Sequence, residues 1–77
     1  MIAVQIDPKE HRRIAVLSSL VALGGSAEWM AMGERGHNLA TILHCIAKGL
    51  VTQRSPTGKR VFDITPAGRA LIEEVAQ

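Results

Sequence analysis

Aromatic residues are nearly absent from this sequence: Trp29 and Phe62 are the only two, and tyrosine does not occur. Proteins that bind single-stranded nucleic acid stack successive bases on several exposed aromatic rings, so the composition argues against that class. Long apolar runs are missing too. The longest stretch without a charged residue, 14–27, contains serines and glycines and is shorter than the roughly 18 residues of a membrane-spanning helix. No membrane partner is expected.

Cysteine occurs once, as Cys45. A single thiol excludes an internal disulfide framework and a CxxC-type zinc site. Together with the lack of a signal-peptide pattern, it predicts a reducing, cytoplasmic setting. His37, His44 and Cys45 are not expected to form a metal site. His44 and Cys45 point about 100° apart around a helix, and His37 lies about two helical turns before His44. No metal or other cofactor is expected, and a redox role for Cys45 would need an intermolecular disulfide.

Motifs of catalysis are also missing. The sequence contains no Ser-His-Asp grouping, no phosphate-binding glycine loop and no HExxH motif. Its 77 residues suffice for one domain, 1–77, whose small core leaves little room for the concave pocket that most enzymes need. We therefore expect a protein that is not an enzyme.

Positive charge is concentrated in the middle of the chain. The net charge is +2, but segment 34–60 holds five basic residues and one acidic residue, whereas the remainder holds four basic and six acidic residues. Such an asymmetry favours a surface that binds an anionic partner.

Capping residues and apolar periodicity predict four helices. Their expected starts are Asp7, Ser26, Asn38 and Thr65. In the third helix, 38–48, four apolar residues recur at i, i+3, i+4 and i+7 and are expected to face the core: Leu39, Ile42, Leu43 and Ile46. The opposite side would present Ala40, Thr41, His44, Cys45 and Lys48 to solvent.

After Gly49 the pattern changes to the two-residue period of strands. Segments 50–54 and 60–64 are rich in β-prone residues and flank a turn at 55–58, which predicts a hairpin with a basic tip. Three helices, a hairpin and a last helix form a mainly α fold with a small β-hairpin. This order is typical of a winged helix-turn-helix, with a three-helix core, a two-stranded wing and a C-terminal helix.

Two stretches, 48–54 (KGLVTQR) and 62–71 (FDITPAGRAL), resemble MarR- and PadR-like winged-helix regulators. In those families K-G-L-V-x-R leaves the recognition helix and L-T-x-x-G-R-x-L closes the wing. Here Gln53 adds one residue before Arg54, and Ile64 replaces the leucine. The resemblance covers about 26–71 and implies a minimal DNA-binding domain. The additional long helices that serve dimerisation and effector binding in those regulators do not occur in this sequence.

On this interpretation, helix 38–48 lies in the major groove of double-stranded DNA and the wing, 54–60, contacts phosphates. The expected DNA-binding residues are Arg35, His37, Asn38, Thr41, His44, Lys48, Arg54, Lys59 and Arg60. Some have structural alternatives: Asn38 can cap the helix, Lys48 suits its C-terminal dipole, and basic side chains protect an exposed sheet edge. His11, Arg12 and Arg13, near the start of the first helix, are expected on a solvated face, with a contact to the DNA backbone as the alternative.

The leading hypothesis is a small transcriptional regulator. One such module buries only about 600–1,000 Å² of protein surface, so specific binding calls for a homodimer on a two-fold site. Ile72, Val75 or segment 1–6 is the expected dimer surface. The alternative is a protein-binding winged-helix module, an inhibitor or adaptor of a nucleic-acid machine, of a size common in phages and mobile elements. It is favoured because the exposed side of the third helix has one fixed positive charge, Lys48.

Overall fold

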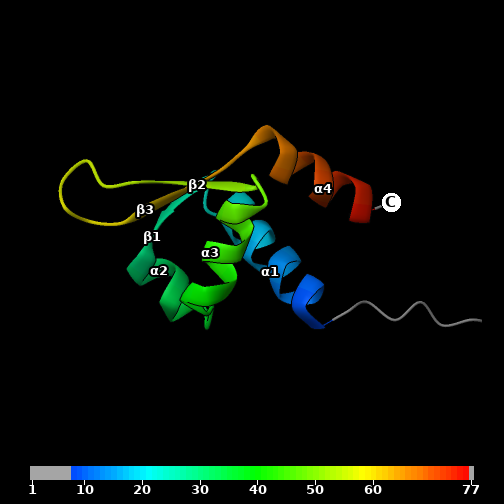
Figure 1. Cartoon of the computed structure of the whole chain (residues 1–77), viewed down its shortest axis with the longest axis horizontal. Coiled ribbons are helices and arrows are strands. Elements are labelled where there is room, and N and C mark those ends of the chain that lie inside the picture. The colour runs from blue at the N-terminus through cyan, green and yellow to red at the C-terminus, as the bar shows by residue number, and fades with distance from the viewer. Residues whose placement is uncertain (1–7, 77) are drawn as a thin grey trace, which may run out of the picture.

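The computed structural model describes residues 8–76, with side chains from 8 to 74. Along these residues the elements are α1 (Pro8–Ala22), β1 (Ser26–Glu28), α2 (Trp29–Glu34), α3 (Leu39–Ala47), β2 (Val51–Arg54), β3 (Val61–Ile64) and α4 (Pro66–Ala76). The structure is mostly helical with a small antiparallel sheet (Figure 1). Within the described part, no helix combines the length and the apolar content needed to cross a membrane. The expected cap Asp7 lies outside the described residues.

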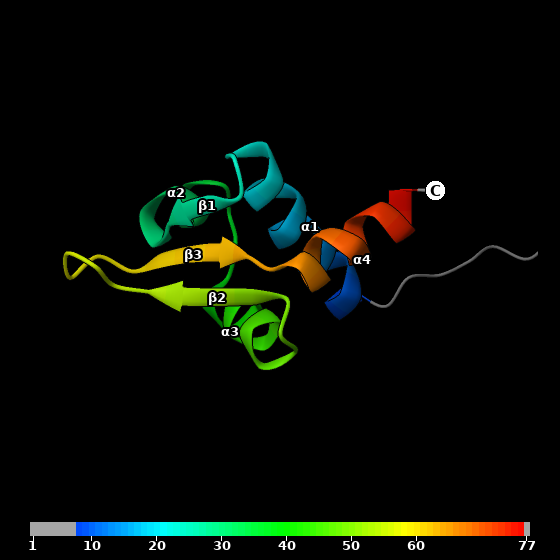
Figure 2. The same cartoon turned by 90° about the horizontal axis from the view of Figure 1, so that it is seen from above.

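Three antiparallel strands form the sheet, in the order β1-β3-β2 (Figure 2). Strands β2 and β3 are the hairpin that the sequence predicted, with Val51 opposite Ile64 and Arg54 opposite Val61. Gly58 in the connecting turn has a φ of +81°, a conformation that glycine adopts without strain. The prediction of a two-stranded sheet is corrected, because β1 adds a third strand along β3.

Ser26–Glu28 forms strand β1, where the sequence predicted the start of a helix capped by Ser26. Helix α2 begins at Trp29 instead. Backbone pairing accounts for the difference: the segment lies along β3, and the Trp29 N–H donates to the Arg60 carbonyl at 2.9 Å. Ala27 meanwhile points into the core. A three-residue strand has too few residues to show a period, so only its partner strand reveals it.

The core lies between α1, α3 and the sheet. Helix α1 contacts α3, α4 and β3. The core side chains with almost no exposure are Val16, Leu17, Leu20, Met32, Ile42, Cys45, Val51 and Phe62. Trp29 packs edge-on against Phe62, with the ring centroids 6.4 Å apart. Because this cluster joins α1, α3 and the sheet, it fixes the position of α3 relative to both neighbours.

Helix α4 begins as the sequence predicted, at Pro66 after Thr65. The Thr65 hydroxyl accepts a hydrogen bond from the Gly68 N–H at 3.1 Å and donates one to the Gly49 carbonyl at 2.8 Å. Residue 68 must be glycine here, because a Cβ would collide with the Leu50 carbonyl oxygen. The start of α4 is therefore fixed against the segment that joins α3 to β2.

The expected dimer residues are placed only in part. Ile72 is half-buried and packs, with Leu71, against the core, so much of its surface is already used within one chain. The side chain of Val75 and segment 1–6 lie outside the described residues. Dimerisation therefore stays a prediction.

Candidate nucleic-acid interface

Asn38 caps α3, as the sequence predicted. Its side-chain oxygen accepts a hydrogen bond from the Ala40 N–H at 2.8 Å. Such a cap satisfies one of the N–H groups that a helix leaves unpaired at its start. The Asn38 side-chain oxygen is thus engaged inside the protein, although the residue is exposed.

The exposed face of α3 differs from the one that periodicity predicted. Leu43, expected in the core, is 46% exposed, whereas Cys45, expected outside, is fully buried. Helix α3 lies between α1 and β2, so its buried strip runs through Ile42 and Cys45. Leu43, about 100° around the helix from Ile42, is turned outward. The exposed residues are Ala40, Leu43, His44 and Ala47, followed by Lys48.

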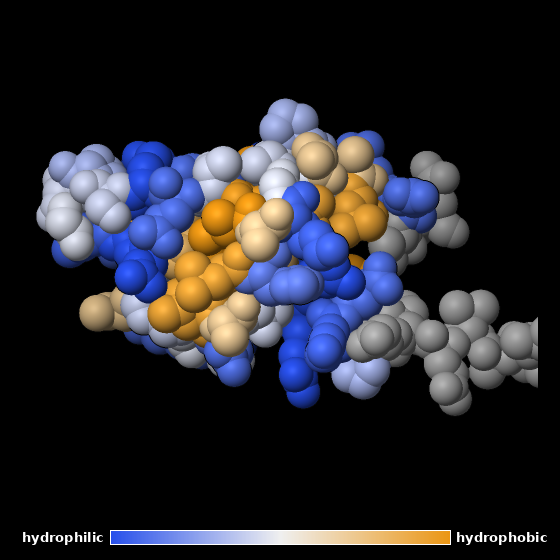
Figure 3. All heavy atoms as spheres, in the orientation of Figure 1, coloured by the Kyte–Doolittle hydropathy of each residue, from blue (hydrophilic) through white to orange (hydrophobic). Residues whose placement is uncertain are grey.

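The solvent-facing surface of α3 is consequently apolar over much of its length. Figure 3 shows apolar side chains over α3 between two hydrophilic surfaces, one belonging to the hairpin β2–β3 and the other to α1. Leu39 and Ile46 are half-buried and widen this apolar surface. Of the polar side chains expected on α3, His44 and Lys48 are exposed, while Thr41 is half-buried.

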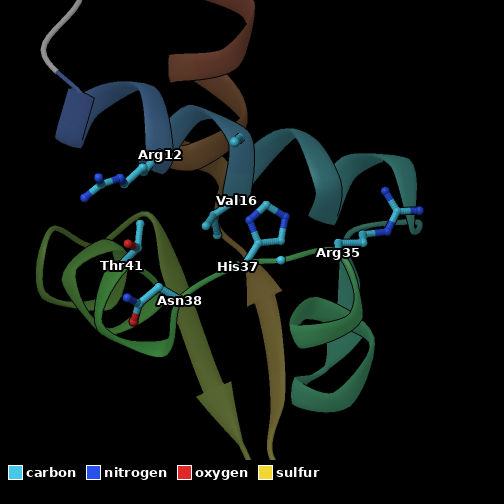
Figure 4. Close-up of a pocket in the computed structure, with 8 residues that line it drawn as sticks. Arg12, Val16, Arg35, His37, Asn38 and Thr41 are labelled. Atoms are coloured by element: carbon cyan, nitrogen blue, oxygen red, sulfur yellow. The ribbon is translucent and has the colours of Figure 1, made fainter.

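A cleft of about 440 Å³ opens between α1 and the turn that leads into α3. Figure 4 shows Arg12 and Arg35 on opposite sides of this cleft, with His37 between them. Asn38 and Thr41 lie opposite Arg12, at the start of α3. Both side chains extend away from His37, so the two guanidinium groups lie at opposite ends of the cleft.

A second cleft, of about 270 Å³, adjoins the first and shares Arg12, Asn38 and Thr41 with it. Its other lining residues are Lys9, Arg13, Ala40 and His44. Neither cleft is lined by an aspartate or a glutamate. We call the two together the α1–α3 groove; its cationic lining residues are Lys9, Arg12, Arg13 and Arg35.

The sequence favoured a solvated face for Arg12 and Arg13, with a contact to the DNA backbone as the alternative, and gave no role to Lys9. A signal was present, because positions 9, 12 and 13 have the i, i+3, i+4 spacing of one helix face. That this face lies along α3 and shares a groove with Arg35 follows only from the packing of α1 against α3. Arg13 is also distinctive because its Nε is buried and has no hydrogen-bond partner among the described residues.

His37 lines the groove but is engaged with α1. Its Nε2 lies 2.7 Å from the Ser19 hydroxyl oxygen, a hydrogen bond that ties the turn before α3 to α1. Burial lowers the pKa of His37, and the charge of Arg35 lowers this pKa further. The imidazole is therefore mainly neutral at pH 7, so its part in the groove is to hold the turn that carries Arg35.

The hairpin carries the remaining expected cations, and these are not equivalent. Arg54 donates two hydrogen bonds to Asp63, from Nε at 2.7 Å and from a terminal nitrogen at 3.3 Å. The hydrogen bonds from Arg54, and then from Ser26, lower the pKa of the Asp63 carboxyl. Lys59 and Arg60 are exposed and form no ion pair with the described residues. Two hairpin cations are thus available to a ligand, and the third is bound within the sheet.

The histidines and the cysteine are not gathered into a metal site. Within the described residues, no group of three or more His, Cys, Asp or Glu side chains is placed to hold a metal ion. Burial raises the pKa of the Cys45 thiol, although the charge of Arg13 lowers it. A buried thiol with a raised pKa is a poor nucleophile, so the position of Cys45 argues against a redox role.

Comparison with known proteins adds no family to these observations. No protein-family model matches the chain, and no curated protein or solved structure matches it either. The resemblance to winged-helix regulators therefore rests on the residues of 48–54 and 62–71 alone.

Proposed function

We propose that this chain is a winged helix-turn-helix domain that binds double-stranded DNA and acts as a small transcriptional regulator. The observation that carries the proposal is the α1–α3 groove, where four cationic residues and no acidic residue line two adjoining clefts beside α3. The regularly spaced phosphates of duplex DNA are the ligand that such a surface suits best.

The position of α3 supports the same proposal. The α1–α3 groove lies on one side of the helix, and strand β2 of the hairpin also contacts α3. Lys59 and Arg60, near the tip of this hairpin, line a third cleft with Glu28, Trp29 and Met30. The major groove of DNA is about 12 Å wide and admits one helix between two phosphate backbones. In the proposed complex α3 enters this groove, and the cations of the α1–α3 groove and of the hairpin bind phosphates.

The internal hydrogen bonds change which residues we assign to DNA. Asn38, His37 and Arg54 are engaged with Ala40, Ser19 and Asp63 respectively, so their main roles are structural. The proposal assigns contacts with DNA to the α1–α3 groove, the exposed side of α3 and the hairpin tip: Lys9, Arg12, Arg13, Arg35, His44, Lys48, Lys59 and Arg60.

The test is the affinity of the chain for a labelled random-sequence duplex between about 50 and 200 mM salt, where phosphate-dominated binding weakens steeply. Arg12→Gln should reduce the slope of log affinity against log salt by about one. Arg69→Gln is the matched control, because it removes the same charge from exposed α4, outside the groove. No binding at about 50 mM salt, or equal effects of the two substitutions, contradicts the proposal.

A second candidate function is binding to a protein rather than to DNA, as an inhibitor or adaptor of a nucleic-acid machine. The apolar face of α3, with Ala40, Leu43 and Ala47 exposed, favours it because exposed apolar patches commonly mark protein interfaces. Under this alternative, Leu43→Ala abolishes partner capture, Arg12→Gln has little effect, and the chain does not bind DNA even at low salt.

A further inference from the structure

The exposed face of α3 lacks the side chains that usually distinguish one base pair from another. Arginine, asparagine and glutamine make the common two-point contacts with guanine and adenine in the major groove. None of the three occurs within α3, and the capping oxygen of Asn38 is already bound to the Ala40 N–H. The exposed side chains of α3 itself are Ala40, Leu43 and Ala47, with His44 as its exposed hydrogen-bonding side chain.

We propose that this apolar strip recognises the C5-methyl groups of thymine. This inference rests on the proposed function, because it names the feature of the DNA that α3 contacts. In the major groove thymine presents a methyl group beside its O4 acceptor, and small apolar side chains are the usual partners of that methyl. Leu43, 46% exposed, lies in the middle of the strip, and Ala40 and Ala47 allow the helix backbone to approach the bases closely.

The length of the strip sets the length of the sequence that it can contact. Positions 40, 43 and 47 lie on one face, and seven residues of α-helix rise about 10 Å. Successive bases on one strand of B-DNA are about 3.4 Å apart, so the strip spans about three base pairs when α3 follows the groove. The preferred site of one chain should therefore contain a short run of A·T pairs.

The charges around the strip favour DNA over an apolar protein as its occupant. On the α1 side the lining of the α1–α3 groove is basic and includes no carboxylate. Lys48 lies exposed at the C-terminal end of α3. Lys59 and Arg60 lie farther along the hairpin, in a cleft that they share with Glu28, Trp29 and Met30. An apolar strip beside a basic groove complements thymine methyl groups beside a phosphate backbone.

The experiment measures the affinity of the chain for a duplex of alternating adenine and thymine and for the same duplex in which uracil replaces every thymine. Uracil differs from thymine only by the absence of the C5-methyl group. At one salt concentration we expect weaker binding to the uracil duplex, by about fourfold for each thymine methyl group that α3 touches. A guanine–cytosine duplex provides the converse measurement: 5-methylcytosine restores a methyl group at C5 and should bind more tightly than cytosine.

Two variants assign the discrimination to α3. Leu43→Ala should discriminate less between the thymine and uracil duplexes than the wild-type chain, because the longest side chain of the strip is lost while Ala40 and Ala47 remain. The exposed position of Leu43 makes a folding defect small. Met30→Ala is the control, because it shortens an apolar side chain that is 73% exposed and lies on α2. This control should retain the wild-type discrimination.

The outcomes separate this inference from the proposed function. Equal, salt-dependent binding of the wild-type chain to both duplexes overturns the recognition of methyl groups but leaves DNA binding standing. Discrimination of the same size in Leu43→Ala as in the wild-type chain arises from the shape of the duplex and also overturns the inference. Absence of binding to either duplex at about 50 mM salt overturns the proposed function itself, and the α3 face then belongs to a protein contact.

Discussion

The α1–α3 groove and the hairpin β2–β3 both carry clusters of positive charge, but they use that charge differently. Four cationic residues line the groove without an acidic residue among its lining. Of the three hairpin cations, Arg54 is bound to Asp63, while Lys59 and Arg60 form no ion pair with the described residues. Counting charges along the chain therefore overstates the positive charge of the hairpin and misses that of the groove.

Strand register explains the difference on the hairpin side. Arg54 lies opposite Val61, and Asp63 lies opposite Thr52, so Arg54 and Asp63 are diagonal neighbours on adjacent strands. A long side chain can reach such a neighbour, and here the two form paired hydrogen bonds. In the groove, by contrast, cations from α1 and from the turn before α3 line two clefts whose described lining contains no aspartate or glutamate.

The largest expected effect comes from the groove. Arg12→Gln combined with Arg35→Gln removes the cations on opposite sides of the first cleft. At 0.1 M salt the double variant should bind DNA about fifty-fold more weakly than the wild-type chain, and this difference should disappear at high salt, where phosphate contacts no longer contribute. Arg54→Gln should weaken DNA binding less than about twofold, because its guanidinium is already engaged. Fluorescence anisotropy measures both affinities. A loss at Arg54 as large as that of the double variant would remove the distinction between the two surfaces.

A smaller change in DNA affinity, an increase, is expected when the acidic residue that binds a hairpin cation is removed. Asp63→Asn removes the carboxylate that holds Arg54, so the hairpin gains an available cation and DNA affinity should rise about fivefold at 0.1 M salt. The combination of Asp63→Asn with Arg54→Gln should return affinity close to the wild-type value. An unchanged affinity for Asp63→Asn alone would mean that the hairpin does not contact phosphates.

The smallest effect concerns pH and lies in the groove. The folded state lowers the pKa of His37 below its ordinary value near 6.5, so the unfolded chain binds more protons at mildly acidic pH. Stability should therefore fall as the pH drops through 6.5 and level off below the folded pKa. Thermal unfolding between about pH 8 and pH 5 measures this as a falling Tm. His37→Gln should show a flatter profile, and an identical profile would contradict this assignment.

In the hairpin, the contribution of Asp63 to stability should depend on pH at more acidic values than that of His37. Arg54 and Ser26 lower the pKa of Asp63, so the contribution of this carboxylate is present above its unfolded pKa of about 3.9 and is lost as the pH falls through the folded value. Urea unfolding at acidic pH should therefore show a smaller loss of stability for Asp63→Asn than for the wild-type chain. Equal losses would show that the exposed pair contributes little.

Local interactions are the part of the fold that could be predicted from sequence. Asn38 caps α3 and Thr65 caps α4 through hydrogen bonds to N–H groups two and three residues away. The hairpin follows from two β-prone segments separated by a turn with a glycine at positive φ. Each of these features is determined within a few residues, so neighbouring side chains suffice to predict it.

Features that depend on distant segments were predicted wrongly or missed. Leu43 is exposed and Cys45 is buried, the reverse of the prediction, because α3 packs against both α1 and β2. The apolar period of a helix does not specify which of its sides faces each of two neighbours. Strand β1 exists because β3 supplies hydrogen-bond partners. The residues that share the groove with Arg12 are likewise set by packing, and the ion-pair partner of Arg54 is set by register.

The sequence by itself determined the four helices, the hairpin, the caps Asn38 and Thr65 and the concentration of positive charge, since these depend on residue chemistry and on neighbours along the chain. Tertiary structure decided which face of α3 meets solvent and which cations remain available to a ligand. The physical reason is that burial and ion pairing depend on distances between residues far apart in sequence. Those distances are fixed only when α1, α3 and the three-stranded sheet pack around one core.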